Sequence, residues 1–155
     1  MATILALTQS QPTRTLAPDD ILIEAGEAGG ELYVLQSGRL IVERDGVDIA
    51  TITDPGALIG EMSVLLGIDH SATVRAHTTS IVRVIEDALP FLERTPLMAL
   101  HVATLACERL NATSALLVDM RKEHEGKASE QGLLARLFAS MVEPPKRSGR
   151  IMAHE

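Results

Sequence analysis

The sequence Ile59-Gly-Glu-Met-Ser-Val-Leu-Leu-Gly-Ile-Asp-His-Ser-Ala-Thr-Val-Arg-Ala76 decides the fold, and we call residues 59–76 the cassette. It begins with Gly-Glu, continues through one short apolar helical turn and a glycine-containing loop, and ends in Ser-Ala-Thr-Val, which is typical of a strand. A short helix has free N–H groups at its start, and a nearby hydroxyl adds one more donor. The cassette therefore predicts a site for one phosphate group.

Short strands are expected on both sides of the cassette, from about Arg14 to Ile85. Glycine, proline and aspartate interrupt the chain at intervals of about 8–12 residues, and Asp45-Gly46 is a strong hairpin signal. The stretches rich in aliphatic and β-branched residues cover 21–23, 31–35, 39–43, 48–52, 73–76 and 80–85. Strands this short and evenly spaced close best as a barrel or a rolled sandwich.

The pattern changes to a helical period after Ile85. Asp87 is expected to cap a short helix over 88–93, and Thr95-Pro96 marks the start of a long helix that reaches about Glu123. One stripe of this helix holds mostly small or apolar residues: Ala99, Ala103, Ala106, Leu110, Thr113, Leu117, Met120 and His124. The stripe could pack on its own β-domain, on the same helix of a second copy, or on both.

The composition limits the possible functions. The chain has 155 residues, is 46% hydrophobic, and carries a net charge of −7, which argues against broad binding to nucleic acid or to an anionic membrane surface. No apolar run is long enough to span a bilayer, and the N-terminus lacks the basic start of a signal peptide. The single cysteine, Cys107, is expected to be a small buried residue. We expect a cytoplasmic protein.

The cassette, the glycine-rich segment from Glu24 to Gly38 and the Thr113-Ser114 pair together resemble the cyclic nucleotide-binding domain family, in particular the catabolite activator proteins. The resemblance covers about residues 14–142. It implies an α+β, mainly β fold, a double-stranded β-helix or jelly-roll-like β-roll with C-terminal helices. We expect an N-terminal segment over 1–13, a cyclic nucleotide-binding domain over 14–125 (β-roll 14–86, helices 87–125), an extra helix over 126–142 and a disordered tail over 143–155.

The resemblance also implies ligand roles within the cassette. Residues of the short helical turn would offer backbone N–H groups to the phosphate, Glu61 would accept from a ribose hydroxyl, and Ser71 would donate to a phosphate oxygen. Two alternatives stay open, since Glu61 could cap its helix and Ser71 could bond the local backbone. The implied ligand residues of the cassette are Gly60, Glu61, Met62, Ser63, His70, Ser71, Ala72 and Thr73.

His70 departs from the family pattern, because an arginine normally precedes the Ser/Thr. A guanidinium offers a fixed fork of donors, whereas imidazole offers at most one donor on each ring edge. A charged hydrogen bond contributes roughly 1.5–3 kcal/mol, so its loss weakens affinity by about tenfold to a hundredfold. His70 either contacts a phosphate-like anion or is a tolerated loop residue. Arg75 lies nearby in sequence but need not face the phosphate.

The long helix contributes a second implied contact. In the family, a Thr-Ser pair on this helix hydrogen-bonds the exocyclic amine of the base, with one hydroxyl from each subunit. Thr113 and Ser114 would then read the base, and Asn111 is a polar candidate beside them. The alternative is that small hydroxyl residues only relieve a tight helix interface. The resemblance predicts a homodimer formed through the helix over 96–124.

The function expected from these observations is a sensor or regulatory module for cAMP or cGMP. We expect no enzyme activity, no metal site and no cofactor besides the nucleotide, because no catalytic or metal-ligand spacing is found. About a dozen residues follow Met141, too few for a DNA-binding helix-turn-helix, so no nucleic acid or membrane partner is expected. The alternative is a degenerate domain that has lost the nucleotide and acts in dimerisation or in docking an unknown protein partner.

Overall fold

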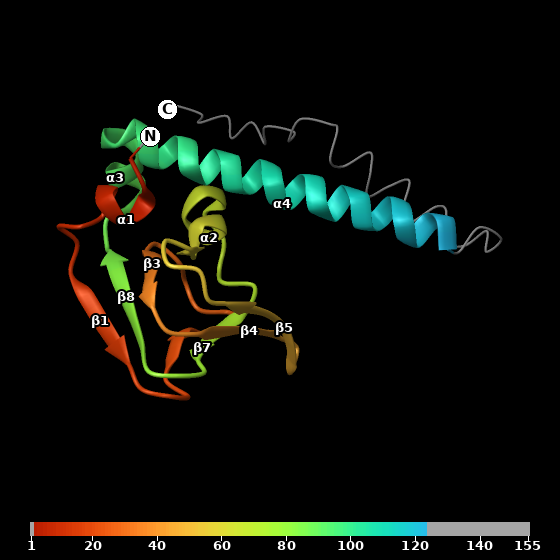
Figure 1. The fold of residues 1–155 in the computed structure, drawn as a ribbon, viewed down its shortest axis with the longest axis horizontal. Coiled ribbons are helices and arrows are strands. Elements are labelled where there is room, and N and C mark those ends of the chain that lie inside the picture. The colour runs from red at the N-terminus through yellow and green to blue at the C-terminus, as the bar shows by residue number, and fades with distance from the viewer. Residues whose placement is uncertain (1, 124–155) are drawn as a thin grey trace, which may run out of the picture. The chain divides into compact units, whose positions relative to one another are not determined.

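The structure, a computed structural model, describes residues 2–123 of the chain (Figure 1). The expected helix over 126–142, the tail over 143–155 and His124 lie outside the described residues. The chain divides into two compact units, residues 1–105 and 106–155. The elements in chain order are α1 (Ile4–Leu7), β1 (Thr13–Leu16), β2 (Ile21–Ile23), β3 (Leu32–Ser37), β4 (Leu40–Arg44), β5 (Val47–Ile52), β6 (Leu58–Ile59), α2 (Glu61–Leu66), β7 (Thr73–Ala76), β8 (Ser80–Ile85), α3 (Ala88–Arg94) and α4 (Pro96–Glu123).

Two antiparallel sheets form the body of the first unit. One sheet has the strand order β1-β8-β3-β6 and the other has the order β2-β7-β4-β5, so strands far apart in the chain lie side by side. The apolar residues of both sheets meet in one cluster that includes Leu35, Leu40, Ile59, Val74 and Val82. This arrangement confirms the predicted mainly β fold with helices after the β-roll.

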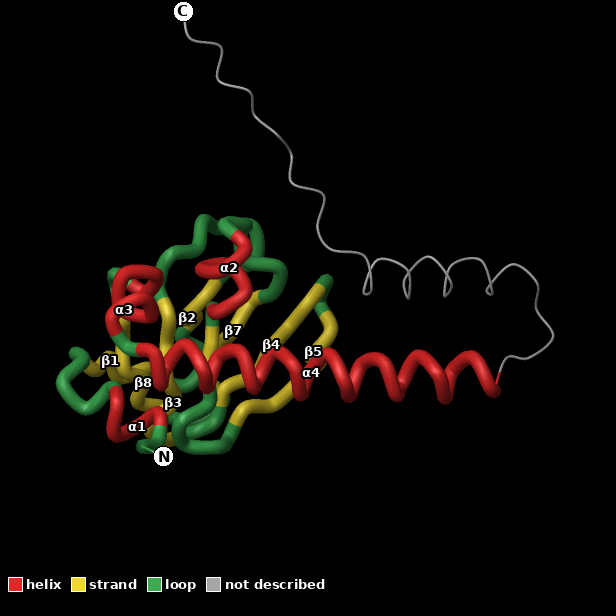
Figure 2. The backbone as a smooth tube through the Cα atoms, turned by 90° about the horizontal axis from the view of Figure 1, so that it is seen from above, coloured by secondary structure: helices red, strands yellow, loops and turns green. Residues whose placement is uncertain are grey.

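Strand β3 is buried on both of its faces. Successive side chains of a strand point to opposite sides, so Tyr33 and Leu35 join the cluster between the sheets while Leu32 and Val34 face a second cluster. In that second cluster Met98, at the start of α4, packs with residues of α3 and is 0% exposed. Figures 1 and 2 show α1 and α3 beside the first turns of α4.

The predicted hairpin is confirmed between β4 and β5. Asp45 (φ 51°) and Gly46 (φ 76°) both adopt positive φ, as a two-residue type I′ turn requires. The expected strands over 21–23, 73–76 and 80–85 match β2, β7 and β8, and the other three expected strands shift by one or two residues. Helix α1 and strands β1 and β6 were not predicted, because all three are too short to show a period in the sequence.

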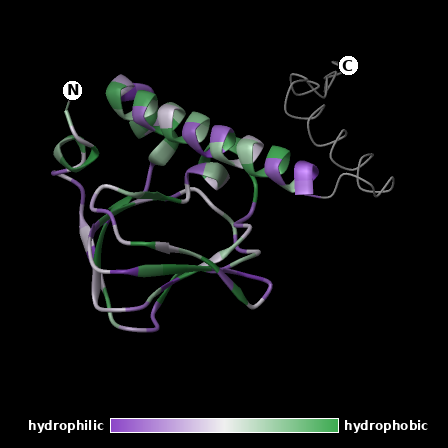
Figure 3. Ribbon diagram, turned by 45° about the vertical axis from the view of Figure 1, so that its right-hand side comes forward, coloured by the Kyte–Doolittle hydropathy of each residue, from purple (hydrophilic) through white to green (hydrophobic). Residues whose placement is uncertain are grey.

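The helical part agrees with the expectations in some respects and differs in others. The expected helix over 88–93 appears as α3, and Asp87 is its N-cap residue, although the side chain makes no capping hydrogen bond. In the first turns of α4 the buried residues are Met98 and Val102, whereas Ala103 of the predicted stripe is exposed, so packing of the stripe on a second copy stays a prediction. Cys107 is exposed rather than buried. Hydrophobic and hydrophilic residues mix around α4 (Figure 3), so helix periodicity was a weak guide to the buried side.

The N-terminal residues are held to the β-roll by Arg83 on β8. Its guanidinium donates to the Leu5 carbonyl and to Thr8 Oγ1 (3.2 Å), and its Nε donates to Gln36 Oε1 at 3.1 Å. Thr8 is fully buried, and its hydroxyl donates a hydrogen bond to the Ile4 carbonyl at 2.7 Å. The acceptors of Arg83 are neutral, and they fix α1 by geometry rather than by charge.

Candidate functional site: the cassette and the cavity beside it

Gly60 allows the chain to pass from β6 into α2. Its φ is 91°, in the left-handed region, and a Cβ at this position would lie 2.9 Å from the Glu31 carbonyl oxygen. Both the backbone conformation and the close approach favour glycine. The first turn of α2 is therefore set directly against the segment that leads into β3.

The residues of α2 differ in exposure. Glu61 and Ser63 are each only 7% exposed, while Met62 is about half exposed. On the other side of the cassette Ser71 is exposed, and Ala72 and Thr73 are half-buried. The Thr73 hydroxyl accepts a hydrogen bond from the Ala25 N–H at 3.1 Å. Thr73 thus helps to hold the loop between β2 and β3 against the cassette.

His70 is fixed by contacts from two directions. Its Nδ1 lies 2.9 Å from the hydroxyl oxygen of Ser63, which joins the end of the cassette loop to α2. Its backbone N–H donates to the Glu27 carbonyl (2.9 Å), and its carbonyl accepts from the Gly26 N–H (2.8 Å). Gly29 packs beside this pair, because a Cβ there would lie 2.3 Å from Ser63 Cβ and 3.4 Å from His70 Cε1. The side chain of His70 therefore has a defined place.

Arg75 has other partners. Its guanidinium lies 3.7 Å from a carboxylate oxygen of Asp19, 3.7 Å from one of Glu43 and 3.5 Å from one of Asp48. Three surrounding carboxylates make this cation a poor candidate for binding an anionic ligand. Arg75 therefore pairs with acidic side chains and does not take the place of the family's arginine at the phosphate site.

A cavity of about 450 Å³ adjoins His70. Most of its polar groups were not predicted from the sequence, since they come from strand β1, from the segment before β3 and from β3 itself. The guanidinium carbon of Arg14 lies 5.8 Å from the centroid of the Tyr33 ring, and the Tyr33 hydroxyl donates to the Glu31 carboxylate. The lining residues are Arg14, Leu22, Ile23, Glu27, Ala28, Gly29, Glu31, Tyr33 and His70.

Tyr33 is the one tyrosine of the chain, and its titration can therefore be followed directly. Burial, assisted by the hydrogen bond to Glu31 and by the negative charge of that carboxylate, raises the pKa of Tyr33 from 10.0 to about 12, while Arg14 acts in the opposite direction. The folded protein thus holds this proton more tightly than the unfolded chain. The contribution of Tyr33 to the free energy of unfolding should be fully present below about pH 10 and should be lost as the pH rises toward about 12.

Spectrophotometric titration of the phenol measures this effect. We expect a midpoint near pH 12 in the wild type and a lower midpoint in Glu31→Gln, which removes the negative charge. Arg14→Gln should move the midpoint in the opposite direction, to a higher pH. Equal midpoints in all three proteins would show that Glu31 and Arg14 do not act on the phenol.

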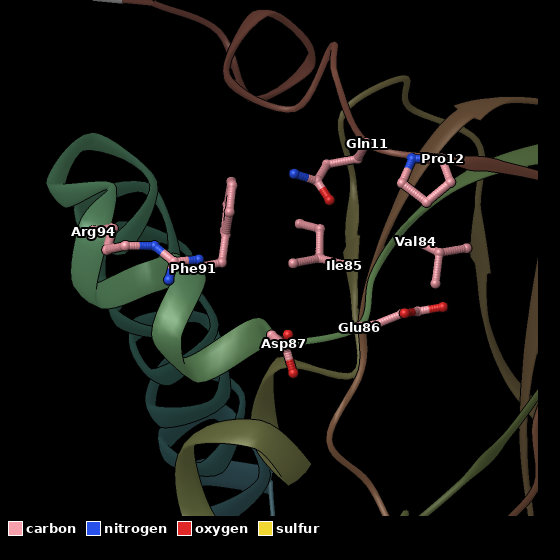
Figure 4. A pocket seen from close by; sticks show the side chains of 8 residues that line it. All are labelled: Gln11, Pro12, Val84, Ile85, Glu86, Asp87, Phe91 and Arg94. Atoms are coloured by element: carbon pink, nitrogen blue, oxygen red, sulfur yellow. The ribbon is translucent and has the colours of Figure 1, made fainter.

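A smaller cavity of about 200 Å³ lies between the segment before β1 and the start of α3 (Figure 4). Phe91 and Ile85 supply apolar walls, and Gln11 and Arg94 add polar groups to the lining. It contains none of the residues that the sequence predicted for the ligand, so it is separate from the cassette.

The three predicted ligand residues of α4, which are Asn111, Thr113 and Ser114, belong to the second unit, residues 106–155. Thr113 donates its hydroxyl to the Arg109 carbonyl and Ser114 donates to the Leu110 carbonyl, each at 2.8 Å. Thr113 and Asn111 are exposed, and Ser114 is half-buried. Because each hydroxyl hydrogen is used within the helix, its oxygen remains an acceptor.

Within residues 2–123, no group of three or more histidine, cysteine or acidic side chains is arranged to hold a metal ion. The same part of the chain contains no helix that is long and apolar enough to cross a membrane.

The family model for the cyclic nucleotide-binding domain matches residues 13–89, which run from β1 through the cassette into α3. Residues 13–89 belong to the cyclic nucleotide-binding domain family. This family is regulatory and its domains are generally not catalytic. The matched range ends before the long helix, so it includes every predicted site residue of the cassette but not Asn111, Thr113 or Ser114.

Comparison with individual proteins gives relatives that are consistent with this family assignment. A cAMP-dependent protein kinase regulatory subunit from Debaryomyces hansenii is 32% identical over 76 residues, 49% of this chain and 17% of that protein. The Thermus thermophilus catabolite activator protein superposes with a TM-score of 0.65 at 27% identity, over 74% of this chain and 56% of that one. The N-terminal domain of a Streptomyces coelicolor transcriptional regulator superposes with a TM-score of 0.52 at 31% identity, over 69% of this chain and 81% of that one. The chain spans only part of the first two proteins.

Proposed function

We propose that this chain is a regulatory domain that binds a cyclic nucleotide, cAMP or cGMP, in the cassette. The observation that carries the proposal is the match of residues 13–89 to the family, with an intact Gly60-Glu61 entry into α2. The name of the related kinase subunit includes cAMP dependence, which supports the same ligand class. Binding would change the surface that the domain presents to a protein partner, and no reaction is assigned to it.

The ligand contacts in this proposal follow the chemistry of each residue. Backbone N–H groups of Gly60–Ser63 and Ala72–Thr73, with the Ser71 hydroxyl, would hold the phosphate. Glu61 is 7% exposed, and its carboxylate would accept from the ribose 2′-hydroxyl. His70 replaces the arginine of the family with one directed donor, so we propose weaker binding than an arginine would give.

The base would be bound by residues of α4. The oxygens of Thr113 and Ser114 remain acceptors after donating to their own helix, which suits the amine of an adenine or guanine base. A homodimer through α4 is part of this proposal, because exposed apolar residues lie on the helix after residue 105. These residues are Leu110, Leu116, Val118 and Met120.

Equilibrium titration of the wild type with cAMP and with cGMP tests the proposal. We expect saturable binding of at least one of them. Ser71→Ala should weaken it by about tenfold to a hundredfold, because a hydrogen bond to a charged phosphate oxygen is lost. Ser37→Ala makes the same change at an exposed residue of β3 and should leave the affinity unchanged.

A second function is favoured by two observations. The exposed apolar residues of α4 and the missing guanidinium at position 70 suit a domain that has lost the nucleotide and acts in dimerisation or docking. If the wild type binds neither nucleotide up to millimolar concentration, this second function replaces the first. Sedimentation of wild type against Leu116→Glu then tests the helix: dissociation of a dimer in the variant would support the second function.

A further inference from the structure

We infer that Ser63 is a positioning residue that fixes His70 as an Nε2–H donor to the anionic oxygen of the ligand. This inference rests on the proposed function, because it assigns a second residue to the same phosphate contact. It concerns how one imidazole can take the place of a guanidinium. The alternative is that the Ser63–His70 contact only closes the cassette loop and has no part in binding.

The hydroxyl of Ser63 decides which nitrogen of His70 carries the proton. Ser63 is buried, and His70 Nδ1 at 2.9 Å is the partner of its hydroxyl within residues 2–123. A buried O–H group needs an acceptor, so the hydroxyl donates and Nδ1 accepts. In the neutral ring the proton then resides on Nε2, at the opposite edge.

The ring is held in this orientation by its surroundings. The two backbone hydrogen bonds with Gly26 and Glu27 fix the main chain on both sides of the His70 Cα atom. The absence of a Cβ at Gly29 leaves room for Ser63 and for the Cε1 edge of the ring. A side chain that is already in place loses less conformational entropy when a ligand binds.

The other groups near His70 set the electrostatic conditions for an anion. Arg14, Glu27 and Glu31 line the same cavity, and Asp69 precedes His70 in the chain. Glu31 already accepts from Tyr33, and Arg14 has no carboxylate within 4.0 Å in the described part of the chain. An anionic oxygen would therefore meet Nε2–H of His70 as a directed donor, with Arg14 as the nearby cation of the cavity.

The tautomer of His70 can be measured without any nucleotide. In the full chain labelled with ¹⁵N-histidine, the ring nitrogen shifts of neutral His70, assigned by their loss in His70→Gln, should show one tautomer with the proton on Nε2. Ser63→Ala should shift the population toward a mixture, while Ser37→Ala should leave it unchanged. A wild-type ring protonated on Nδ1, or no change in Ser63→Ala, would overturn the inference.

The ligand arm separates this inference from the proposed function. Ser63→Ala should weaken cAMP binding by about two- to tenfold, the range expected for one lost hydrogen bond. The melting temperature of the free protein should stay close to that of the wild type. An altered tautomer with unchanged affinity would show that Ser63 only closes the loop. If the wild type does not bind cAMP or cGMP, the proposed function fails while the tautomer result still reports on the ring.

Discussion

Replacing His70 with arginine is expected to strengthen cAMP binding by about tenfold to a hundredfold. The guanidinium offers a fork of charged donors that matches two phosphate oxygens, whereas imidazole offers one donor at its Nε2 edge. The gain corresponds to roughly 1.5–3 kcal/mol for one additional charged hydrogen bond. The half-buried position of His70, between Ser63 and the Gly26–Glu31 segment, brings the new side chain to the same place.

A matched control separates this contact from a general effect of charge. His77 is an exposed histidine just after β7, and His77→Arg makes the same chemical change outside the cassette. We expect His77→Arg to bind like the wild type in the same calorimetric titration. Equal affinity of His70→Arg and the wild type would mean that residue 70 does not face the phosphate.

Truncation of Met98 to alanine is expected to lower the free energy of unfolding by about 2–5 kcal/mol. Met98 is 0% exposed and packs in the cluster with Leu32, Leu92 and Val102, so its removal leaves a cavity between α4 and the β-roll. Urea unfolding measures the loss. Within residues 1–105, Met98 and Val102 are the buried residues through which the first turns of α4 pack on the β-roll.

The neighbouring residue provides the control for Met98. Leu97 is 42% exposed on the same helical turn, and Leu97→Ala should cost less than about 1 kcal/mol. A similar loss in both variants would show that the unfolding transition does not depend on the buried side of α4, and that the cluster around Met98 does not anchor α4.

The parts of the fold that could be predicted have strong local causes. The Asp45-Gly46 turn needs two positive φ values, which these residues tolerate, and the structure has them. The cassette order of glycine, short helix, loop and strand appears as Gly60, α2 and β7. Pro96 begins α4 as expected, because proline suits the first turn of a helix.

The parts that could not be predicted depend on contacts between distant residues. Helix α1 has four residues and is held by Arg83, which lies more than seventy positions later. The Ser63–His70 hydrogen bond needs the bare backbone of Gly29 beside it, and no local pattern indicates that approach. Likewise, Arg14 and Tyr33 reach one cavity because β1 and β3 both pair with β8.

Binding of a cyclic nucleotide in the cassette can be followed residue by residue, by titrating the ¹⁵N-labelled full chain with cAMP and recording the amide chemical shifts. We expect saturable shifts that are largest for residues 60–63 and 70–73. No saturable shifts with either cAMP or cGMP, or shifts confined to residues outside the cassette, would contradict binding in the cassette.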